Sequence, residues 1–217
     1  KYYQENRTNS KYNDLSQWLI KALVSTEDER YYEHSGIDVR ALARVAKGVL
    51  TGNTSQGGGS TISQQLSKLL FPREKLSKLE LVVRKFKEWI IAIRLERQYT
   101  KDEILTMYLN CFDWVNNAVG IKSASSVYFN KEPIDLNVEE SAMLVGMLKN
   151  PALYNPNRRK ELTESRRNIV LSQMNKYDFI SDSLFDTLLR GIRSGEITEV
   201  YDDSYFTAKL TKAEINS

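Results

Sequence analysis

Apolar side chains recur at three- and four-residue intervals along most of the chain. This spacing places them on one face of a helix, which is the pattern of an amphipathic helix that packs against a core. Signals for β-strands are weak and confined to short pieces. The pattern therefore predicts a mainly α fold, with helices over residues 14–24, 39–50, 78–98, 161–175 and 182–193 and others that begin after Thr61, Thr100 and Asn137.

Short polar residues stand where several of these helices are expected to begin. Thr61, Thr100 and Asn137 are each followed three residues later by Gln or Glu, which is the spacing of a capping box. Asp38 is a plausible N-cap for the helix over residues 39–50. Pro72 is expected to end the helix that starts after Thr61, because proline interrupts the helical hydrogen bonds.

Two segments lack helical periodicity. Residues 51–59 contain three consecutive glycines, which hold neither helix nor strand well and predict a flexible loop. Beyond Met174 the periodicity loosens, and residues 195–217 are polar. We therefore expect one domain over residues 1–175, followed by a C-terminal helix and a linker or tail over residues 176–217.

The composition is that of an ordinary globular domain. The chain has 217 residues, of which 41% are hydrophobic and 27% charged, so it can bury a real core. Its net charge of +3 is too mild to indicate a nucleic-acid-binding protein. No apolar run is long enough to span a membrane, and no signal-peptide pattern opens the chain. A start at Lys1 without methionine suggests a piece of a longer protein.

The chain has one cysteine and one histidine, which limits the possible chemistry. Cys111 cannot form an intramolecular disulfide and is expected to be a small buried residue. A zinc site of the usual kind cannot be assembled. His34 fits a buried hydrogen-bonding residue better than a general base. A Ser-His-Asp triad is arithmetically possible, but no Gly-x-Ser-x-Gly elbow is present. Carboxylates are the remaining candidates.

One carboxylate cluster precedes a pair of aromatic residues. Glu27-Asp-Glu29 ends an apolar helix immediately before Tyr31-Tyr32. A carboxylate half covered by aromatic rings could act as an acid or a base. A solvated helix end would give the same pattern, because Asp and Glu are mostly exposed.

Two further segments suggest anion binding. Arg84, Lys85 and Glu88 lie on one helix, where the Arg84–Glu88 step forms either a surface salt bridge or a basic site with an adjacent carboxylate. The glycine-rich loop leads directly into the polar helix start at Thr61, and backbone N–H groups at helix N-termini favour anions. No Gly-Lys-Ser/Thr follows the glycines, so the loop is not a Walker motif.

Taken in order, five blocks of the sequence resemble the peptidoglycan glycosyltransferases, glycosyltransferase family 51, found in class A penicillin-binding proteins and monofunctional transglycosylases. The resemblance covers about residues 15–175. The blocks are Glu27-Asp-Glu-Arg-Tyr-Tyr-Glu-His34-Ser-Gly36, Gly59-Ser-Thr-Ile-Ser-Gln-Gln65 with Lys68 after it, Arg84-Lys-Phe-Lys-Glu88, Lys101-Asp-Glu-Ile-Leu-Thr-Met-Tyr-Leu-Asn110 and Arg166-Arg-Asn-Ile-Val-Leu171.

The sequence departs from the family pattern in two places. Leu69 stands where the family usually has Asn directly after the lysine of the second block. Phe112-Asp-Trp-Val-Asn-Asn replaces a run of an aromatic residue, Gly, Asn and Gly, whereas Gly120 and the pair Tyr128-Phe129 still fit. Neither departure affects a carboxylate.

The resemblance implies a lysozyme-like glycosyltransferase fold with a globular head and a smaller membrane-facing jaw. It also implies inverting transfer of lipid-linked disaccharide units, in which lipid II attacks a growing strand and polyprenyl diphosphate is released. By the same resemblance Glu27 is the general base and Glu88 a second catalytic residue. Residues implied to bind substrate or diphosphate are Asp28, Thr61, Gln65, Lys68, Arg84, Lys85 and Lys149, and those implied to maintain the motifs are His34, Gly36, Asn110 and Gly120.

The role of Glu88 stays open at this point. It could help the leaving group depart, hold a divalent cation such as Mg²⁺ against the diphosphate, or orient Arg84 and Lys68. Mg²⁺ suits a site rich in carboxylate and phosphate oxygens. No organic cofactor is expected.

The resemblance also implies partners and a location. Lipid II and the nascent glycan strand are the expected substrates, and moenomycin-type inhibitors are expected ligands. The mixed lysine and apolar segments Leu66–Phe71 and Lys75–Val83 fit a core face, or a surface that rests on a membrane. The expected location is the extracytoplasmic, periplasmic face of the bacterial inner membrane, with an anchor outside this chain. A downstream transpeptidase domain is a possible partner, because this chain has no Ser-x-x-Lys or Lys-Thr-Gly element of its own.

Two other functions are compatible with parts of this pattern. A catalytically silent module could bind lipid-linked precursors, but it would not need both Glu27 and Glu88. A glycan hydrolase also uses paired carboxylates. It would not need the cationic residues that suit a diphosphate.

Overall fold

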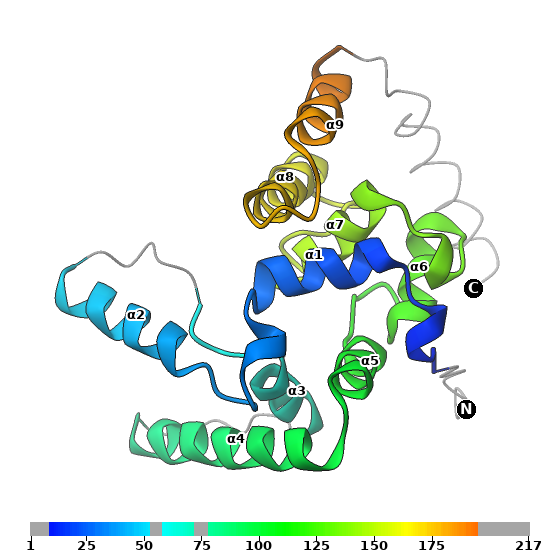
Figure 1. Ribbon diagram of the computed structural model, residues 1–217. Helices are drawn as coiled ribbons and strands as arrows, with labels where there is room; N and C mark the ends of the chain where they lie inside the picture. Colours follow the sequence, from blue (N-terminus) through cyan, green and yellow to red (C-terminus); the bar gives the residue numbers. More distant parts are fainter. Residues whose placement is uncertain (1–8, 53–57, 72–77, 195–217) are drawn as a thin grey trace. The chain divides into compact units, whose positions relative to one another are not determined.

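The computed structural model describes residues 9–52, 58–71 and 78–194. Within these ranges the chain is helical, apart from turns and one isolated antiparallel bridge between Asp113 and Val119 (Figure 1). The mainly α prediction is confirmed. The predicted tail at 195–217 and residues 53–57 of the predicted loop lie outside the described residues. The α-helices are α1 (Gln17–Glu27), α2 (Val39–Leu50), α3 (Ile62–Leu70), α4 (Lys78–Gln98), α5 (Lys101–Cys111), α6 (Ile121–Phe129), α7 (Val138–Met147), α8 (Lys160–Lys176) and α9 (Asp182–Ser194), with short 3-10 helices at Tyr12–Asp14, Tyr31–Glu33 and Pro133–Asp135.

The helix starts predicted at Asp38, Thr61, Thr100 and Asn137 are confirmed, whereas the first helix begins at Gln17 and not at the predicted residue 14. Thr100 and Asn137 form complete capping boxes at α5 and α7. The carboxylate of Asp38 accepts a hydrogen bond of 3.0 Å from the backbone N–H of Ala41 in α2. Thr61 accepts from the Gln64 backbone N–H at 3.2 Å. The side chain of Gln64 bonds elsewhere, so the box predicted at α3 is only half formed.

Helix α6 was not predicted from the sequence. It begins after Gly120, whose φ of +82° suits glycine and which provides no side-chain cap. It ends at Asn130, which adopts the left-handed conformation with φ of +52°. A start without a capping side chain explains why the sequence pattern did not reveal this helix.

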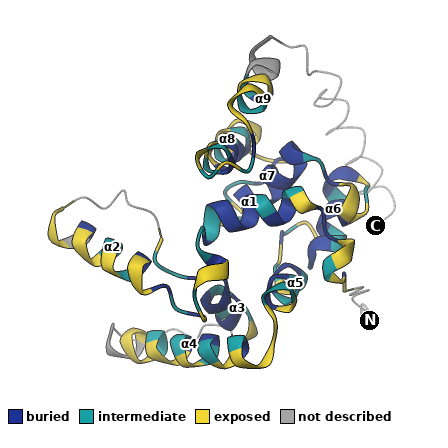
Figure 2. Cartoon of the chain, in the orientation of Figure 1, coloured by how far each residue is buried: buried dark blue, intermediate teal, exposed yellow. Residues whose placement is uncertain are grey.

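The described residues form two compact units. Unit one contains Asn13–Thr26 and the described residues from Asp113 onward. Its centre is α7, which is buried along its whole length and packs against α8 (Figure 2). The buried ring of Trp114 also contributes, because its indole N–H donates to the Leu144 carbonyl at 3.0 Å.

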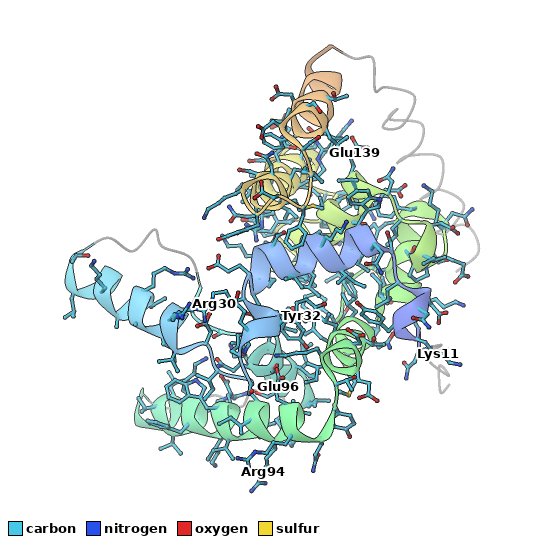
Figure 3. All side chains as sticks on the ribbon, in the orientation of Figure 1. Lys11, Arg30, Tyr32, Arg94, Glu96 and Glu139 are labelled. Atoms are coloured by element: carbon cyan, nitrogen blue, oxygen red, sulfur yellow. The ribbon has the colours of Figure 1, made fainter. Side chains whose placement is uncertain are left out.

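Unit one also contains two buried residues of opposite charge, one of them in the fifth sequence block. Glu139 lies at the start of α7 (Figure 3), Arg167 lies on α8, and both side chains are buried. Burial raises the pKa of Glu139, and the positive charge of Arg167 opposes this shift. Near the other end of α7, a Cβ at Gly146 would lie 3.2 Å from Cγ of Arg166. The fifth block therefore packs closely against α7.

Unit two contains Ser10–Tyr12 and the described residues of Glu27–Phe112. Helix α3 packs against both α4 and α5, and Ile62, Leu66, Ile104 and Leu105 are fully buried there. Full burial of such a side chain contributes roughly 1.5–3 kcal/mol to folding.

Asn110 joins the two sequence segments of unit two. Its amide accepts from the Ser10 backbone N–H at 3.1 Å and donates to the Ser10 carbonyl at 2.9 Å. This supports the structural role implied for Asn110. Its neighbour Cys111 is exposed, so the prediction of a buried cysteine was wrong. Position 111 is the last residue of α5 and lies at the surface of the helix bundle.

Candidate active site

The residues of the first sequence block form a tight turn after α1. Asp28 is only 7% exposed, and both of its carboxylate oxygens are engaged. One oxygen lies 2.9 Å from Nε2 of His34, and the other accepts a 3.0 Å hydrogen bond from the backbone N–H of Ile62. Asp28 therefore fixes the turn to the start of α3. This favours a structural role for Asp28 and His34 over direct contact with a substrate.

The same turn requires glycine at position 36. Gly36 has φ of +89°, and a Cβ there would lie 2.8 Å from the backbone carbonyl of Ala92 in α4. The Gly36 carbonyl accepts from the Thr61 hydroxyl at 2.7 Å and from the Gln64 amide at 3.2 Å. Thr61 is thus occupied in joining the turn to α3, which again favours a structural role over substrate binding.

A partly buried ion pair supports the turn from its other side. The ammonium of Lys101 lies 2.8 Å from a carboxylate oxygen of Glu96 and donates to the His34 carbonyl. It also lies 4.2 Å from the centre of the Tyr31 ring. Glu96 points from α4 toward α3, where it accepts from Ser63 (Figure 3). Lys101 and Glu96 were not predicted as site residues, because their pairing depends on the corner between α4 and α5.

Glu27 is held by a chain of hydrogen bonds that we call the base site: Glu27, Gln65 and Tyr108. Glu27 is the last residue of α1 and is partly exposed. The amide nitrogen of Gln65 donates to Oε2 of Glu27 at 2.9 Å. The hydroxyl of Tyr108 donates to Oε1 of Gln65 at 3.0 Å. A partly exposed carboxylate with a defined orientation is suited to proton transfer.

Four charged residues form what we call the cation cluster: Lys68, Arg84 and Lys85 around Glu88. Their nitrogen atoms lie 3.9, 3.5 and 3.3 Å, in that order, from the nearest carboxylate oxygen of Glu88. Lys85 also donates to the Ser60 hydroxyl at 2.9 Å and to the Gln64 amide oxygen at 3.4 Å. Arg84 donates to the Phe71 carbonyl at 3.0 Å. Ser60 and Gln64 were not among the predicted site residues, although both lie in the second block.

The cation cluster carries a positive excess next to the base site. Three cations surround one carboxylate, which leaves a formal charge of +2. Glu88 is 8% exposed, so the interactions are screened less than those of a surface pair. Gln65 and Lys68 are three residues apart on α3 and therefore lie on one face of that helix. The arrangement places an anion-attracting site beside a carboxylate.

Two predicted site residues belong to unit one. Lys149 follows the end of α7 and is exposed. Gly120 directly precedes α6, as described above. The role of Lys149 toward a diphosphate stays a prediction, because the structure brings together Lys68, Arg84 and Lys85 within unit two only.

The surroundings of Glu88 fit a divalent cation poorly. Mg²⁺ is held by several oxygen ligands, whereas Glu88 is a single carboxylate with three cationic neighbours. Among the described residues, no group of three or more His, Cys, Asp or Glu side chains could hold a metal ion. The role of Glu88 stays a prediction at this point.

Comparison with known proteins identifies the family of this chain. A family model described as Transglycosylase matches residues 1–175. The chain is 42% identical to penicillin-binding protein 1F of Bacillus subtilis over 180 residues, which cover 82% of this chain and 24% of that protein. It is 39% identical to penicillin-binding protein 1A of Pseudomonas aeruginosa over 179 residues, covering 82% and 21%. It is 32% identical to penicillin-binding protein 1A of Neisseria lactamica over 216 residues, covering 99% and 27%.

These matches show the family. The chain belongs to the transglycosylases, the peptidoglycan glycosyltransferase domains homologous to those of class A penicillin-binding proteins. The resemblance stated from the five sequence blocks is thereby confirmed. The chain spans about a quarter of the length of these relatives. No helix in the described part of the chain is long and apolar enough to cross a membrane.

Proposed function

We propose that this domain polymerises lipid II into glycan strands by inverting transfer, with release of polyprenyl diphosphate. The observation that carries this proposal is the proximity of two features on α3 in unit two. Gln65 holds a partly exposed carboxylate, and Lys68, three residues further on, belongs to a cluster with positive excess. Attack by a sugar hydroxyl needs a base, and departure of a diphosphate needs positive charge.

In this mechanism Glu27 accepts the proton of the attacking hydroxyl group. Gln65 fixes one carboxylate oxygen by its 2.9 Å hydrogen bond and leaves the other oxygen for the acceptor sugar. A carboxylate oriented in advance loses little entropy when the acceptor binds.

The cation cluster stabilises the negative charge that develops on the leaving diphosphate. Lys and Arg side chains donate charge-assisted hydrogen bonds to phosphate oxygens. Glu88 keeps the three cations together in the absence of substrate, because their mutual repulsion would otherwise separate them. We therefore assign Glu88 to orienting the cations, and no step of the mechanism requires a metal ion bound by the protein.

An assay with lipid II and with preformed glycan distinguishes this function from the two alternatives. The domain is expected to convert lipid II into long glycan strands, which gel electrophoresis of labelled product would display. Fragments released from preformed glycan, without any strand synthesis, would instead identify a hydrolase. Saturable lipid II binding without product from a folded sample would identify a silent binding module. Either result would overturn the proposed function.

Unit two also exposes an apolar surface that suits contact with a membrane. Val82, Phe86 and Ile90 are spaced four residues apart on α4, and each is more than half exposed. A separate apolar pair, Leu70 and Phe71 at the end of α3, is 42% and 57% exposed. A helix face such as that of α4 binds the boundary between lipid headgroups and acyl chains. We propose that it holds the domain on the extracytoplasmic face of the inner membrane, where the substrate lipid is embedded.

Replacing Val82, Phe86 and Ile90 with serine is expected to weaken binding to phosphatidylglycerol-containing vesicles by at least about tenfold. Each side chain contributes roughly 1.5–3 kcal/mol when fully removed from water, and partial insertion recovers a fraction of that. Flotation of the domain with vesicles measures the effect. Leu162→Ser with Ile169→Ser on α8 is the matched control, because those residues are similarly exposed. Equal flotation of the two variants would contradict the proposed surface.

A further inference from the structure

Tyr108, a buried residue of α5, is joined to the other two residues of the base site through its hydrogen bond to Gln65. Its side chain is 1% exposed, and its hydroxyl donates to Oε1 of Gln65 at 3.0 Å. The amide of Gln65 in turn donates to Glu27. The three side chains come from α5, α3 and the end of α1, and the packing of α3 against α5 holds the first two in place. The sequence resemblance assigned no role to Tyr108.

The direction of both hydrogen bonds follows from the chemistry of the three groups. An ionised carboxylate only accepts, so the Gln65 group that faces Glu27 must be the NH₂. The Gln65 carbonyl oxygen then faces Tyr108, and it can be satisfied only if the phenol donates. The opposite amide orientation would place a carbonyl oxygen against the carboxylate, with no hydrogen between them. Tyr108 therefore selects the amide orientation that Glu27 needs.

The environment keeps the phenol protonated and hence a donor. Burial raises the pKa of Tyr108 well above its ordinary value, and the negative charge of Glu27 raises it further. The Tyr108 ring also packs against the ring of Phe112, with 6.1 Å between ring centres, and this contact restricts its position. A fixed, permanently protonated donor is what a defined amide orientation requires.

We propose that Tyr108 is a positioning residue for the base, and that it acts on Glu27 through Gln65. This inference rests on the proposed role of Glu27. Without the Tyr108 hydroxyl, Oε1 of Gln65 would be left without its buried donor, and the amide would turn toward other partners. Glu27 would then lose the hydrogen bond that fixes it toward the acceptor hydroxyl.

Tyr108→Phe tests this inference in the intact domain with lipid II as substrate. The expected result is a fall in kcat of between about tenfold and about a hundredfold, because small misplacements of a catalytic group have effects of that size. KM is expected to change by less than about twofold, since the cation cluster that binds the diphosphate is unaltered. Tyr128→Phe is the matched control: its buried hydroxyl donates to the Trp114 carbonyl at 2.7 Å in unit one. It should retain the wild-type kcat within about twofold.

A double-mutant comparison shows whether Tyr108 acts through Gln65. Gln65→Leu should lower kcat, and adding Tyr108→Phe to it should cause no further loss, because the intermediary is already absent. Independent, multiplying losses would overturn the inference, and so would a Tyr108→Phe variant with the kcat of Tyr128→Phe. If Tyr108→Phe proves unstable in a thermal melt, Gln65→Glu is tested in its place. This variant is expected to lower kcat at unchanged KM, and an unchanged kcat would overturn the inference. A Glu27→Gln variant that still makes strands would instead refute the proposed function, so the two failures are distinguishable.

Discussion

A Glu27→Gln variant is expected to make glycan strands at least about a hundredfold, and up to about ten-thousandfold, more slowly than the wild-type domain. The substitution keeps the size of the side chain but removes its capacity to accept the hydroxyl proton. The Gln65 amide can still meet the new side-chain oxygen, so the local structure should persist. The rate of lipid II consumption measures the effect.

The loss should fall on kcat, because Glu27 acts on the reacting hydroxyl group and the cation cluster remains intact. Binding of lipid II, measured separately, should change by less than about threefold. Glu33→Gln is the appropriate control: Glu33 lies in the same turn, but its carboxylate is 61% exposed and pairs with Arg30. If both variants polymerise lipid II at the same rate, Glu27 is not the base.

The parts of the fold that the sequence could predict are those specified by neighbouring residues. Thr100 and Asn137 each lie three positions before the carboxylate that completes the capping box. Both helix starts could therefore be predicted from neighbouring residues. Helix α6 shows the opposite case. Its start depends on the backbone conformation of Gly120, which leaves no side-chain signal in the sequence.

The site shows the same limit for contacts between distant residues. Asp28 and Thr61 were predicted to bind substrate because both lie in blocks that resemble the family, and that role stays a prediction. In the structure their polar groups join the first turn to α3, through Ile62 and Gly36, over about thirty positions of sequence. Neither composition nor residue spacing predicts hydrogen bonds between residues so far apart in the sequence. The position of Tyr108 opposite Gln65 likewise follows only from the packing of α5 on α3.

Unlike these buried contacts, the cation cluster was partly predicted from the sequence. Removal of one of its cations is expected to slow the reaction strongly. Arg84→Ala is expected to lower kcat by about a hundredfold to a thousandfold. This is the usual loss when one group that stabilises a developing negative charge is removed, and it corresponds to roughly 2.7–4 kcal/mol. Arg84 is favourably placed for this role, because Glu88 and the Phe71 carbonyl hold its guanidinium. The rate of polyprenyl diphosphate release measures the effect.

Arg94→Ala on the same helix provides the control for charge and for helix stability. Arg94 is exposed, and its side chain extends from α4 into solvent (Figure 3). Its removal changes the net charge equally but should leave kcat within about twofold, since exposed charges are strongly screened. Arg84→Lys should recover only part of the lost rate, because an ammonium retains the charge but lacks the planar fork of donors. Equal rates for Arg84→Ala and Arg94→Ala would mean that the cluster does not act on the leaving group, and that its positive charge serves only to hold Glu88.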